Sequence, residues 1–539
     1  MKKTITLFLV VVLIASLAAC GGPSATPTAT PTPAPEGEGT PAPSTGPTEV
    51  PPPEGVPEYG GVLKIIGGNT NALIGLPWEC QSIDQATLVP WAECLLLETS
   101  SGDISGWLAE SYEPDMENSE IRFKLKEGIK FSDGSDFNAE VVCWNFQMSK
   151  EAGALNPAIL GAEVRGEYEL AVLLDGYSNS AMHMICSRTF GFVSKVNYET
   201  NGEEYARNNP VGTGPFKLKE MVPGLKVVFE KNENYWMEGR PYLDGIEYLD
   251  ITDIMTRVAA MQSTGSDAAD ILDTTVAEQV AMLRDSGAAV TFNKFSFGPI
   301  SLQPSSKNED SPFAKLEVRQ AVAHAIDRET ICEARGFGNL TPAYQLIPEG
   351  YKGNLKDPNY ITYDTAKAKE LLAQAGYPDG FTTTFYAGSG SDRDMVVIIQ
   401  SMLAEVGITA EIEFPEAAAM AQMRSSAGWE GLMLGTVRAL PNMTSTFRLN
   451  FDPDYQFAIS LWRPVDEMRP IYVEARSTLM LEDSIMQNLH TLFMDNMVAI
   501  PICDTYDTFV IRESVHDTGF ALWGANTWWL PHDAWKSAS

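Results

Sequence analysis

Side chains that commonly perform catalysis or bind metal ions are present in this chain, but their spacing suits neither task. Histidine occurs five times at scattered positions, namely His183, His324, His490, His516 and His532. No two cysteines form a CxxC pair, and no cysteine has a histidine at metal-ligand spacing. The sequence also lacks a Gly-x-Ser-x-Gly elbow, a His-Glu-x-x-His motif and a Walker loop. These patterns predict no catalytic residue, no metal site and no cofactor.

Two glycine pairs fall short of a nucleotide-binding motif. Gly212-Thr-Gly214 and Gly336-Phe-Gly338 lack the third glycine and the strand-to-helix context of a dinucleotide loop, so both are expected to be turns. Carboxylates are abundant along the whole chain, and a pair at the separation that glycosidases use is compatible with the sequence. A lipid-anchored extracellular hydrolase therefore stays open as an alternative function.

Length and charge restrict the class of protein. The 539 residues suffice for two or three domains with a large buried core. The 38 basic and 71 acidic residues give a formal net charge of −33, which opposes binding to nucleic acids and to anionic membrane surfaces. We expect this diffuse negative charge to favour solubility rather than to select a ligand.

The first twenty residues are typical of an exported protein. Lys2 and Lys3 form a charged segment, Ile5–Leu17 is apolar, and small residues precede Cys20. The apolar run is too short to cross about 30 Å of hydrocarbon comfortably, so it indicates a secretory signal over residues 1–19. Leu17-Ala-Ala-Cys20 resembles a bacterial lipobox, which implies that Cys20 becomes the lipidated N-terminus of the mature protein.

The next segment, residues 20–58, is predicted to be a lipidated tether. From Gly21 to Pro57 it consists almost wholly of Pro, Thr, Ala, Gly, Ser and Glu, so it has too little apolar surface to fold. In an extended polyproline conformation, at about 3.1 Å per residue, it spans on the order of 100 Å. A lipid anchor followed by a polar spacer predicts a protein on the outer face of the bacterial cytoplasmic membrane, or in the periplasm if the cell has an outer membrane.

Six cysteines follow the anchor. They are Cys80, Cys94, Cys143, Cys186, Cys332 and Cys503. An even number in an exported chain permits disulfides, and the sequence favours Cys80 with Cys94 as the local pair. Buried free thiols are the alternative in a domain of this size.

Local signals predict several strands and helices in the folded part. Ile121–Lys126 alternates apolar and basic residues, as in a strand with one buried face. Asn138 is placed to cap a helix that runs from Ala139 to about Met148, and Asp364 is placed to cap another that ends at Gly376.

The second half of the chain alternates strands with helices. The expected strands are Thr382–Tyr386, Ile408–Phe414 and Gly431–Leu434, and two further helices at Ile471–Leu481 and Ile485–Asn496 precede a strand at Met497–Ile502. This order predicts an α/β domain with a largely parallel sheet.

Three stretches carry patterns that belong together. Residues 108–146 combine the alternating strand with the turn Phe-Ser-Asp-Gly and the capped helix. Residues 211–251 open with Gly-Thr-Gly-Pro and continue with a hairpin and the aromatic run Asn-Tyr-Trp-Met-Glu-Gly-Arg-Pro-Tyr. Residues 312–329 form an amphipathic helix. In this order they resemble the family 5 extracellular solute-binding proteins, the peptide- and nickel-binding components of ABC importers, and the resemblance extends from Tyr59 to the C-terminus.

The resemblance implies a two-lobed α/β fold of the periplasmic-binding-protein type (type II, cluster C-like), with an extra domain in the first lobe. The implied boundaries are residues 59–99, 208–304 and 515–539 for the core domain of the first lobe, 100–207 for its extra domain, and 305–514 for the second lobe. The tail, residues 523–535, carries four tryptophans and is expected to pack on the first lobe.

The resemblance also implies where a solute binds. In family members the second-lobe contacts come from the loop after the strand at 431–434, which here offers Thr436, Arg438 and Asn442. Peptide-binding members usually place an aspartate where this chain has Ala439 beside Arg438. A guanidinium prefers carboxylates or phosphates and repels ammonium groups, which favours a solute with an anionic or hydroxyl-rich end over a standard oligopeptide. A surface position for Arg438 is the alternative.

Four aromatic residues are further candidates for solute contacts, because each can stack on a ring or an aliphatic chain: Trp78, Phe297, Tyr386 and Trp462. Core packing is the alternative for each of them. The resemblance implies a monomer that delivers a peptide or another organic solute to an ABC permease, with transport energy supplied by an ATPase subunit. A binding protein that serves a sensor instead of a permease is the remaining alternative.

Overall fold

The computed structural model describes most of the chain after the tether. The described residues are 55–67, 70, 73–80, 84–99, 102–115, 117–176, 178–265, 268–356, 361–426, 428–451, 468–478, 480–520 and 529–537. They all belong to the second of two units along the chain, Met1–Ala42 and Pro43–Ser539. The lipidation candidate Cys20, the tether up to residue 54 and the aromatic candidate Trp462 lie outside the described residues.

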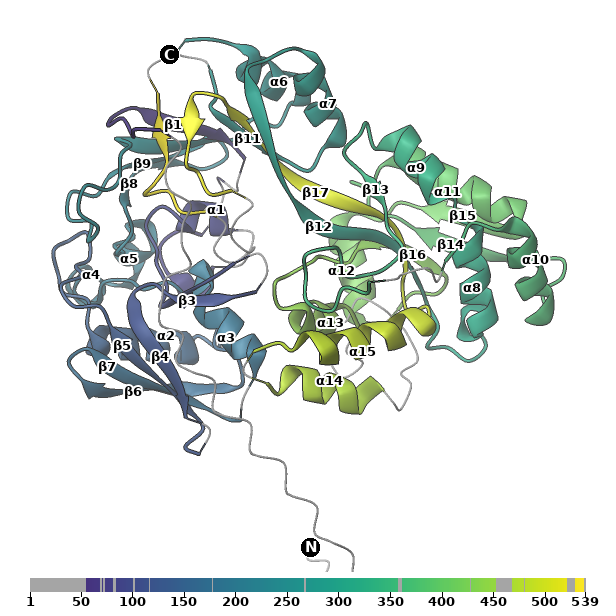
Figure 1. The fold of residues 1–539 in the computed structure, drawn as a ribbon, viewed down its shortest axis with the longest axis horizontal. Coiled ribbons are helices and arrows are strands. Elements are labelled where there is room, and N and C mark those ends of the chain that lie inside the picture. Colours follow the sequence, from purple (N-terminus) through teal and green to yellow (C-terminus); the bar gives the residue numbers. More distant parts are fainter. Residues whose placement is uncertain are drawn as a thin grey trace, which may run out of the picture. The chain divides into compact units, whose positions relative to one another are not determined.

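One large mixed sheet runs through the molecule (Figure 1). Its strands, in spatial order, are β15 (Ile408–Glu413), β14 (Phe381–Tyr386), β16 (Leu432–Thr436), β12 (Val290–Pro304), β17 (Ile500–Arg512), β11 (Ile271–Thr274), β1 (Val62–Ile66), β10 (Gly245–Leu249), β9 (Lys226–Lys231) and β8 (Phe216–Val222). The short strand β13 (Thr341–Pro342) also pairs with β17. The long strands β12 and β17 are antiparallel to each other over most of their length.

The hydrophobic core divides along these two long strands. Leu302 of β12 and Ile502 of β17 belong to a core that is built from residues between 302 and 503. Phe509 and Ile511, farther along β17, belong to a separate core that also contains residues from β1, β10 and the C-terminal tail. The chain therefore forms two lobes that share β12 and β17, named lobe 1 and lobe 2 in chain order.

Lobe 1 contains a second sheet whose strands lie in the order β4 (Ala109–Asp115), β5 (Glu120–Leu125), β7 (Glu169–Leu174) and β6 (Ile159–Gly166). Helix α2 (Ala139–Glu151) packs against this sheet, and the side chain of Asn138 accepts a hydrogen bond from Val141 N at 3.1 Å, which confirms the predicted cap. The other helices of lobe 1 are η1 (Pro77–Glu79), α1 (Gln85–Leu88), α3 (Asn179–Ile185), η3 (Arg188–Phe190), α4 (Lys195–Asn201), α5 (Glu203–Asn208), α6 (Ile254–Gln262) and α7 (Ala277–Asp285). Two small sheets pair β2 (Leu96–Glu98) with β3 (Ile104–Gly106), and β18 (Val515–His516) with β19 (Trp535–Lys536).

Lobe 2 has the predicted α/β order, but its sheet is mixed rather than largely parallel. Strand β14 is parallel to β15 and β16, whereas β16 is antiparallel to β12 because β12 enters from lobe 1. Asp364 caps α10 through Lys367 N at 2.8 Å, as predicted. The helices of lobe 2 are η4 (Pro312–Ala314), α8 (Leu316–Ala325), α9 (Arg328–Arg335), α10 (Thr365–Gln374), α11 (Arg393–Glu405), α12 (Ala417–Ser426), α13 (Met443–Phe451), α14 (Met468–Arg476) and α15 (Asp483–Asp495).

The stretch at residues 211–251 forms the predicted hairpin, with β8 and β9 antiparallel across the turn at Gly224. Gly212 and Gly214 are required here by close packing rather than by an unusual backbone angle. A Cβ atom on Gly212 would lie 2.1 Å from the carbonyl oxygen of Trp91, and Gly214 N donates to that oxygen at 2.9 Å. The glycine pair thus holds the start of the hairpin against the segment that follows α1.

The aromatic run after the hairpin surrounds a buried carboxylate. Glu93 is 1% exposed and accepts three hydrogen bonds, from Trp107 Nε1 at 2.9 Å, Tyr235 OH at 3.1 Å and Trp236 Nε1 at 3.0 Å. Tyr235 and Trp236 therefore pack inside lobe 1 and link three separate segments of the chain. The described part of the tail packs there too, because Trp529 and Ala534 lie in the same core as β1.

The six described cysteines are free thiols, so the predicted pairing of Cys80 with Cys94 is wrong. The thiol of Cys80 donates to the carbonyl of Leu76 at 3.3 Å, while that of Cys94 donates to the carbonyl of Leu96 at 3.0 Å. Four of the thiols are buried, as the alternative expected. Within the described ranges, no helix combines the length and the apolar character needed to span a bilayer.

Candidate functional site

Strands from both lobes end at the middle of β12 and β17. In lobe 1, β11 runs along β17 and ends at Thr274, while in lobe 2, β16 runs along β12 and ends at Thr436. The pairing register places Phe295–Pro299 of β12 and Asp504–Asp507 of β17 between these two ends. These nine residues are called the central segment. The carboxyl ends of parallel strands are the usual ligand-binding edge of an α/β sheet, so both lobes direct that edge at the central segment.

The loop after β16 keeps pairing with the central segment and holds Arg438 against it. Val437 N donates to Pro299 O at 2.9 Å, and Ala439 N donates to Phe297 O at 2.9 Å. Between these two bonds, the guanidinium carbon of Arg438 lies 5.2 Å from the centre of the Phe297 ring. Phe297 and Arg438, which are far apart in the sequence and were both predicted to contact the solute, therefore lie together in the structure.

Arg438 is half-buried. Burial lowers the pKa of Arg438 from its usual value, while Asp507 and Tyr351 raise it. Tyr351 OH donates to Ser296 O in the central segment at 3.1 Å, and burial raises the pKa of Tyr351 to about 12. No hydrogen bond or ion pair among the described residues involves the Arg438 guanidinium.

Three carboxyl groups belong to strands that meet at the central segment. Asp273 of β11 and Asp507 of β17 are hydrogen-bonded to each other, and burial raises the pKa of both, with the charge of Asp507 adding to the effect on Asp273. We infer that Asp273 donates the hydrogen bond and that Asp507 accepts it, because Asp507 interacts electrostatically with Arg438. Burial also raises the pKa of Asp504 to about 7, and its buried Oδ1 has no hydrogen-bond partner.

These carboxyl groups do not have the spacing of a glycosidase pair. Asp273 and Asp507 are in direct hydrogen-bond contact, whereas the two carboxyls of a glycosidase lie about 5–9 Å apart on either side of the scissile bond. Among the described residues, no group of three or more His, Cys, Asp or Glu side chains is arranged to hold a metal ion. The site offers charged and aromatic groups for binding.

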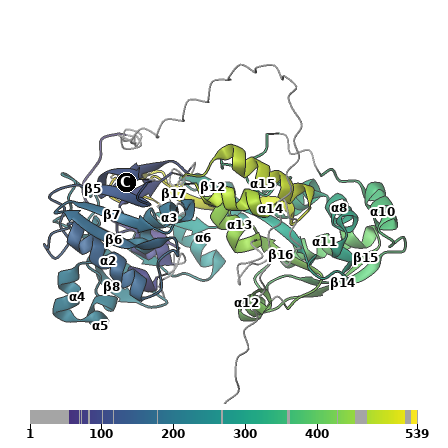
Figure 2. The same cartoon turned by 90° about the horizontal axis from the view of Figure 1, so that it is seen from below.

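A second set of contacts joins the lobes away from the central segment (Figures 1 and 2). Asn179, at the start of α3 in lobe 1, donates to the carbonyl of Ala475 in α14 at 2.6 Å. Its Oδ1 accepts from Thr444 Oγ1 at 2.7 Å and from Asn442 Nδ2 at 3.1 Å. Asn442, a predicted solute contact, is 4% exposed and therefore uses its amide to connect the two lobes.

The other predicted candidates lie in different surroundings. Thr436 is the last residue of β16, opposite Ile300, and so borders the central segment. Tyr386, the last residue of β14, packs edge-on against Trp429 with 6.4 Å between the ring centres. Trp78 lies in η1 of lobe 1, where its ring centre is 6.0 Å from that of Trp144.

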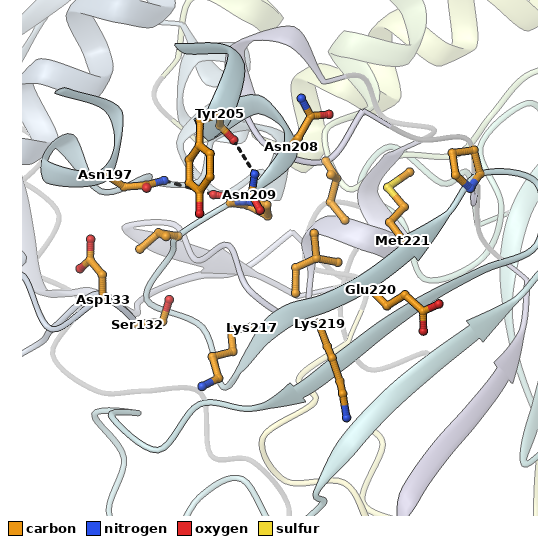
Figure 3. Close-up of a pocket in the computed structure, with 15 residues that line it drawn as sticks. Ser132, Asp133, Asn197, Tyr205, Asn208, Asn209, Lys217, Lys219, Glu220 and Met221 are labelled. Atoms are coloured by element: carbon orange, nitrogen blue, oxygen red, sulfur yellow. Dashed lines mark hydrogen bonds between the residues drawn. The ribbon is translucent and has the colours of Figure 1, made fainter. Parts of the chain in front are cut away.

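A recess of about 530 Å³ opens on lobe 1 (Figure 3). Tyr205 and Asn209 lie on one side of it, with Asn209 Nδ2 donating to Tyr205 O at 3.0 Å, and Lys217 and Lys219 of β8 lie on the other. All of its lining residues belong to lobe 1. This recess is therefore separate from the strand ends at which the two lobes meet.

Sequence reasoning missed Asp273, Asp504, Asp507 and Asn179. One signal was available for two of them: Asp504 and Asp507 lie between two apolar runs, Ile500–Cys503 and Phe509–Ile511. Charged residues between such runs need a partner or a function. Asp273 and Asn179 have no comparable local signal, because their partners are far away in the sequence.

Comparisons with known proteins agree with this geometry. The family model described as "Bacterial extracellular solute-binding proteins, family 5 Middle" matches residues 103–457. The glutathione-binding protein GsiB of Salmonella typhi is 30% identical over 362 residues, which is 65% of this chain and 69% of that protein. The oligopeptide-binding protein AppA of Bacillus subtilis is 30% identical over 341 residues, which is 57% of this chain and 60% of AppA.

Solved structures show the same two-lobed fold. The structure of HbpA2 from Haemophilus parasuis superposes with a TM-score of 0.75 at 18% identity, covering 88% of this chain and 100% of HbpA2. Such a likeness concerns the fold alone. The family model, by contrast, covers well over half of the sequence, and the chain therefore belongs to the bacterial extracellular solute-binding proteins of family 5.

Proposed function

We propose that this protein captures a small organic solute between its two lobes, at the central segment, and presents it to the permease of an ABC importer. The observation that carries the proposal is the convergence of β11 from lobe 1 and β16 from lobe 2 on the same segment of β12 and β17. Two lobes that close on a solute bury it, and a permease can distinguish the closed form from the open form.

The residues at the strand ends are the proposed solute contacts. Arg438 lies over the ring of Phe297, which belongs to the central segment. Thr436 ends β16 beside this segment, and Tyr386 ends the neighbouring parallel strand β14. The names of the relatives favour a peptide or a similar compound as the solute. Because an ATPase subunit supplies the energy for transport, the binding protein needs no catalytic group and is proposed to have no enzymatic activity.

The N-terminal segment and the lobe boundaries complete the proposal. Cys20 is proposed to carry a lipid that anchors the protein outside the cytoplasmic membrane, with residues 21–58 as the spacer. The core domain of lobe 1 is proposed to comprise residues 59–99, 208–304 and 515–539, with an extra domain at 100–207 and lobe 2 at 305–514. The protein is proposed to act as a monomer.

Thermal unfolding with a panel of candidate solutes tests this function. The purified full chain should be stabilised by at least one member of a panel of peptides, oligosaccharides and small acids. At a hundredfold excess over the dissociation constant, the gain is about 2.7 kcal/mol. Chromatography after incubation should recover the solute unchanged, and chemical conversion of the solute would contradict a transport function.

Two phenylalanines provide a matched test of the location. Phe297 and Phe414 are both half-buried, and each lies beside an arginine, Arg438 at 5.2 Å and Arg393 at 4.2 Å. Only Phe297 belongs to the central segment. Phe297→Ala should therefore weaken binding of the stabilising panel member by about tenfold or more, whereas Phe414→Ala should leave it within about threefold. Equal losses would place the solute elsewhere.

A further inference from the structure

The backbone of Arg438 is fixed more firmly than a surface loop requires. The amides on either side of it pair with β12, and its own carbonyl accepts a hydrogen bond from Thr446 Oγ1 at 2.7 Å. Gly298 makes this close approach possible, because a Cβ atom there would lie 2.1 Å from the carbonyl oxygen of Val437. The position from which the Arg438 side chain leaves the loop is therefore set by the fold.

The guanidinium itself has been left without an acceptor. Two other arginines of lobe 2 that lose water contacts are hydrogen-bonded to carbonyl oxygens: Arg328 donates to Ala343 O at 3.0 Å, and Arg319 donates to Asn496 O at 3.0 Å. For Arg438, by contrast, the described residues provide the face of Phe297 and no oxygen within hydrogen-bond distance. A solute that buries these N–H donors must offer them acceptors, because burying donors without an acceptor is costly.

The neighbouring carboxylate does not satisfy this need. Asp507 is hydrogen-bonded to Asp273 instead, and burial raises the pKa of both carboxyl groups. Asp507 interacts electrostatically with Arg438, but it accepts no hydrogen bond from the guanidinium. The guanidinium carbon lies over the ring of Phe297 at 5.2 Å, a contact that engages none of the N–H donors in a hydrogen bond.

We propose that Arg438 is the anion-binding residue of the cleft, and that the solute presents a carboxylate or a phosphate to it in a bidentate arrangement. This inference rests on the proposed function and names the chemical class of its solute. Arginine is suited to both oxyanions, because its paired N–H groups match their oxygens. Asp507 of β17 interacts electrostatically with Arg438, and Asp273 of β11 is hydrogen-bonded to Asp507, so acidic groups border the proposed anion site.

Matched pairs of compounds test the proposal on the full chain. The pairs are trialanine with trialanine amide, succinate with succinamide, and ribose phosphate with ribose. We expect thermal stabilisation by the member of at least one pair that carries the carboxylate or phosphate, and not by the counterpart that lacks it. A response to succinate or trialanine identifies a carboxylate, and a response to ribose phosphate alone identifies a phosphate.

Substitutions then assign the effect to a side chain. Arg438→Gln should raise the dissociation constant of the binding anion by about 10- to 100-fold, and Arg438→Lys should recover only part of the loss, because an ammonium keeps the charge but not the paired donors. Arg424→Gln is the matched control: Arg424 is also half-buried beside β16, burial also lowers its pKa, and its Nε lies 3.5 Å from Met433 Sδ. The control should change the dissociation constant by less than about threefold.

The outcomes test the anion-binding role of Arg438 separately from the proposed function. If neutral or cationic compounds alone stabilise the protein, or if Arg438→Gln binds the anion unchanged, Arg438 is not the anion-binding residue while the proposed function survives. If Arg424→Gln rather than Arg438→Gln lost affinity for the anion, the anion would bind near Arg424 and not at Arg438. Stabilisation by no member of any class would contradict the proposed function itself.

Discussion

Asp504 is a carboxyl group whose ionisation works against folding. Burial raises its pKa from 3.8 to about 7. In the unfolded chain the carboxyl titrates near its ordinary value, about 3.9, so between about pH 4 and pH 7 the folded protein binds more protons than the unfolded one. The free energy of unfolding should therefore fall as the pH rises through this window.

Asp504→Asn removes this titration. Urea unfolding at pH 4 should give the wild type and the variant similar stability, and at pH 8 the variant should be more stable by about 1–3 kcal/mol, a range reduced for the partial exposure of the side chain. The Asp273–Asp507 pair titrates in both proteins and cancels from the difference. Asp285→Asn is the control for loss of a carboxyl group at an exposed position, because its side chain is 74% exposed. A pH-independent difference at Asp504 would show that its carboxyl ionises normally.

At the residue scale, the sequence predicts what short-range chemistry decides. Asn138 and Asp364 each cap a helix that starts at the next residue, so their roles can be predicted from their neighbours. The contact between Asp273 and Asp507 cannot be predicted in this way, because it depends on β11 pairing with β17. Arg438 was a candidate from the sequence, but its position over Phe297 required the fold.

At the element scale, α3 and the helices α13 and α14 form a contact that exists only while the lobes are together. Asn179 supplies the donor and the acceptor for it, and its side chain is 3% exposed. Asn179→Ala removes these bonds and leaves the polar side chains of Asn442 and Thr444 without their partner. Since the proposed function couples closure to binding, the variant should bind the stabilising solute about 10-fold more weakly, as expected for loss of about 1–2 kcal/mol.

Asn156→Ala is the matched control for this contact. Asn156 Nδ2 donates to Ser180 Oγ at 3.0 Å, so this asparagine also bonds to α3 but entirely within lobe 1. Calorimetry should show little change in its solute affinity, although its unfolding midpoint falls. Small-angle scattering should show a larger radius of gyration for Asn179→Ala than for Asn156→Ala. Equal affinities in the two variants would mean that Asn179 stabilises lobe 1 alone.

The elements differ in how well their sequences predict them. Capped amphipathic helices such as α10 were predicted within one or two residues, since the cap, the apolar face and the final glycine agree. Strand β17 was predicted only as Met497–Ile502, because Asp504, Thr505 and Asp507 break the apolar pattern although the strand continues to Arg512. The polar residues of the central segment therefore made the full length of β17, a strand that joins the lobes, unpredictable from the apolar pattern.

At the scale of the whole molecule, two lobes with separate cores depend on two continuous strands. The family signatures could predict this architecture, since they lie in the order in which the chain enters and leaves each lobe. They could not predict the register in which β12 and β17 pair, which places the ends of β11 and β16 at one site. That register shifts near Gly298, because β12 contains one extra residue, Phe297, between the pairs Ser296–Tyr506 and Gly298–Thr505.

Gly298 is therefore the residue at which a small change should affect both lobes. Its φ is +113°, a value that other residues rarely adopt, and a Cβ atom would collide with the carbonyl of Val437. Gly298→Ala should lower the free energy of unfolding by about 2–4 kcal/mol, the sum of backbone strain and a displaced loop. Because that loop carries Arg438, the same substitution should weaken solute binding.

Gly350→Ala separates these two causes. Gly350 also has a positive φ, +89°, but no atom lies within 4 Å of the position of its Cβ. Backbone strain alone should cost this variant about 1 kcal/mol and leave solute affinity unchanged. Urea unfolding and calorimetry on both variants make the comparison. Equal losses of stability in the two variants, without a loss of affinity, would contradict this prediction. They would mean that the close approach of Gly298 to the Arg438 loop does not affect solute binding.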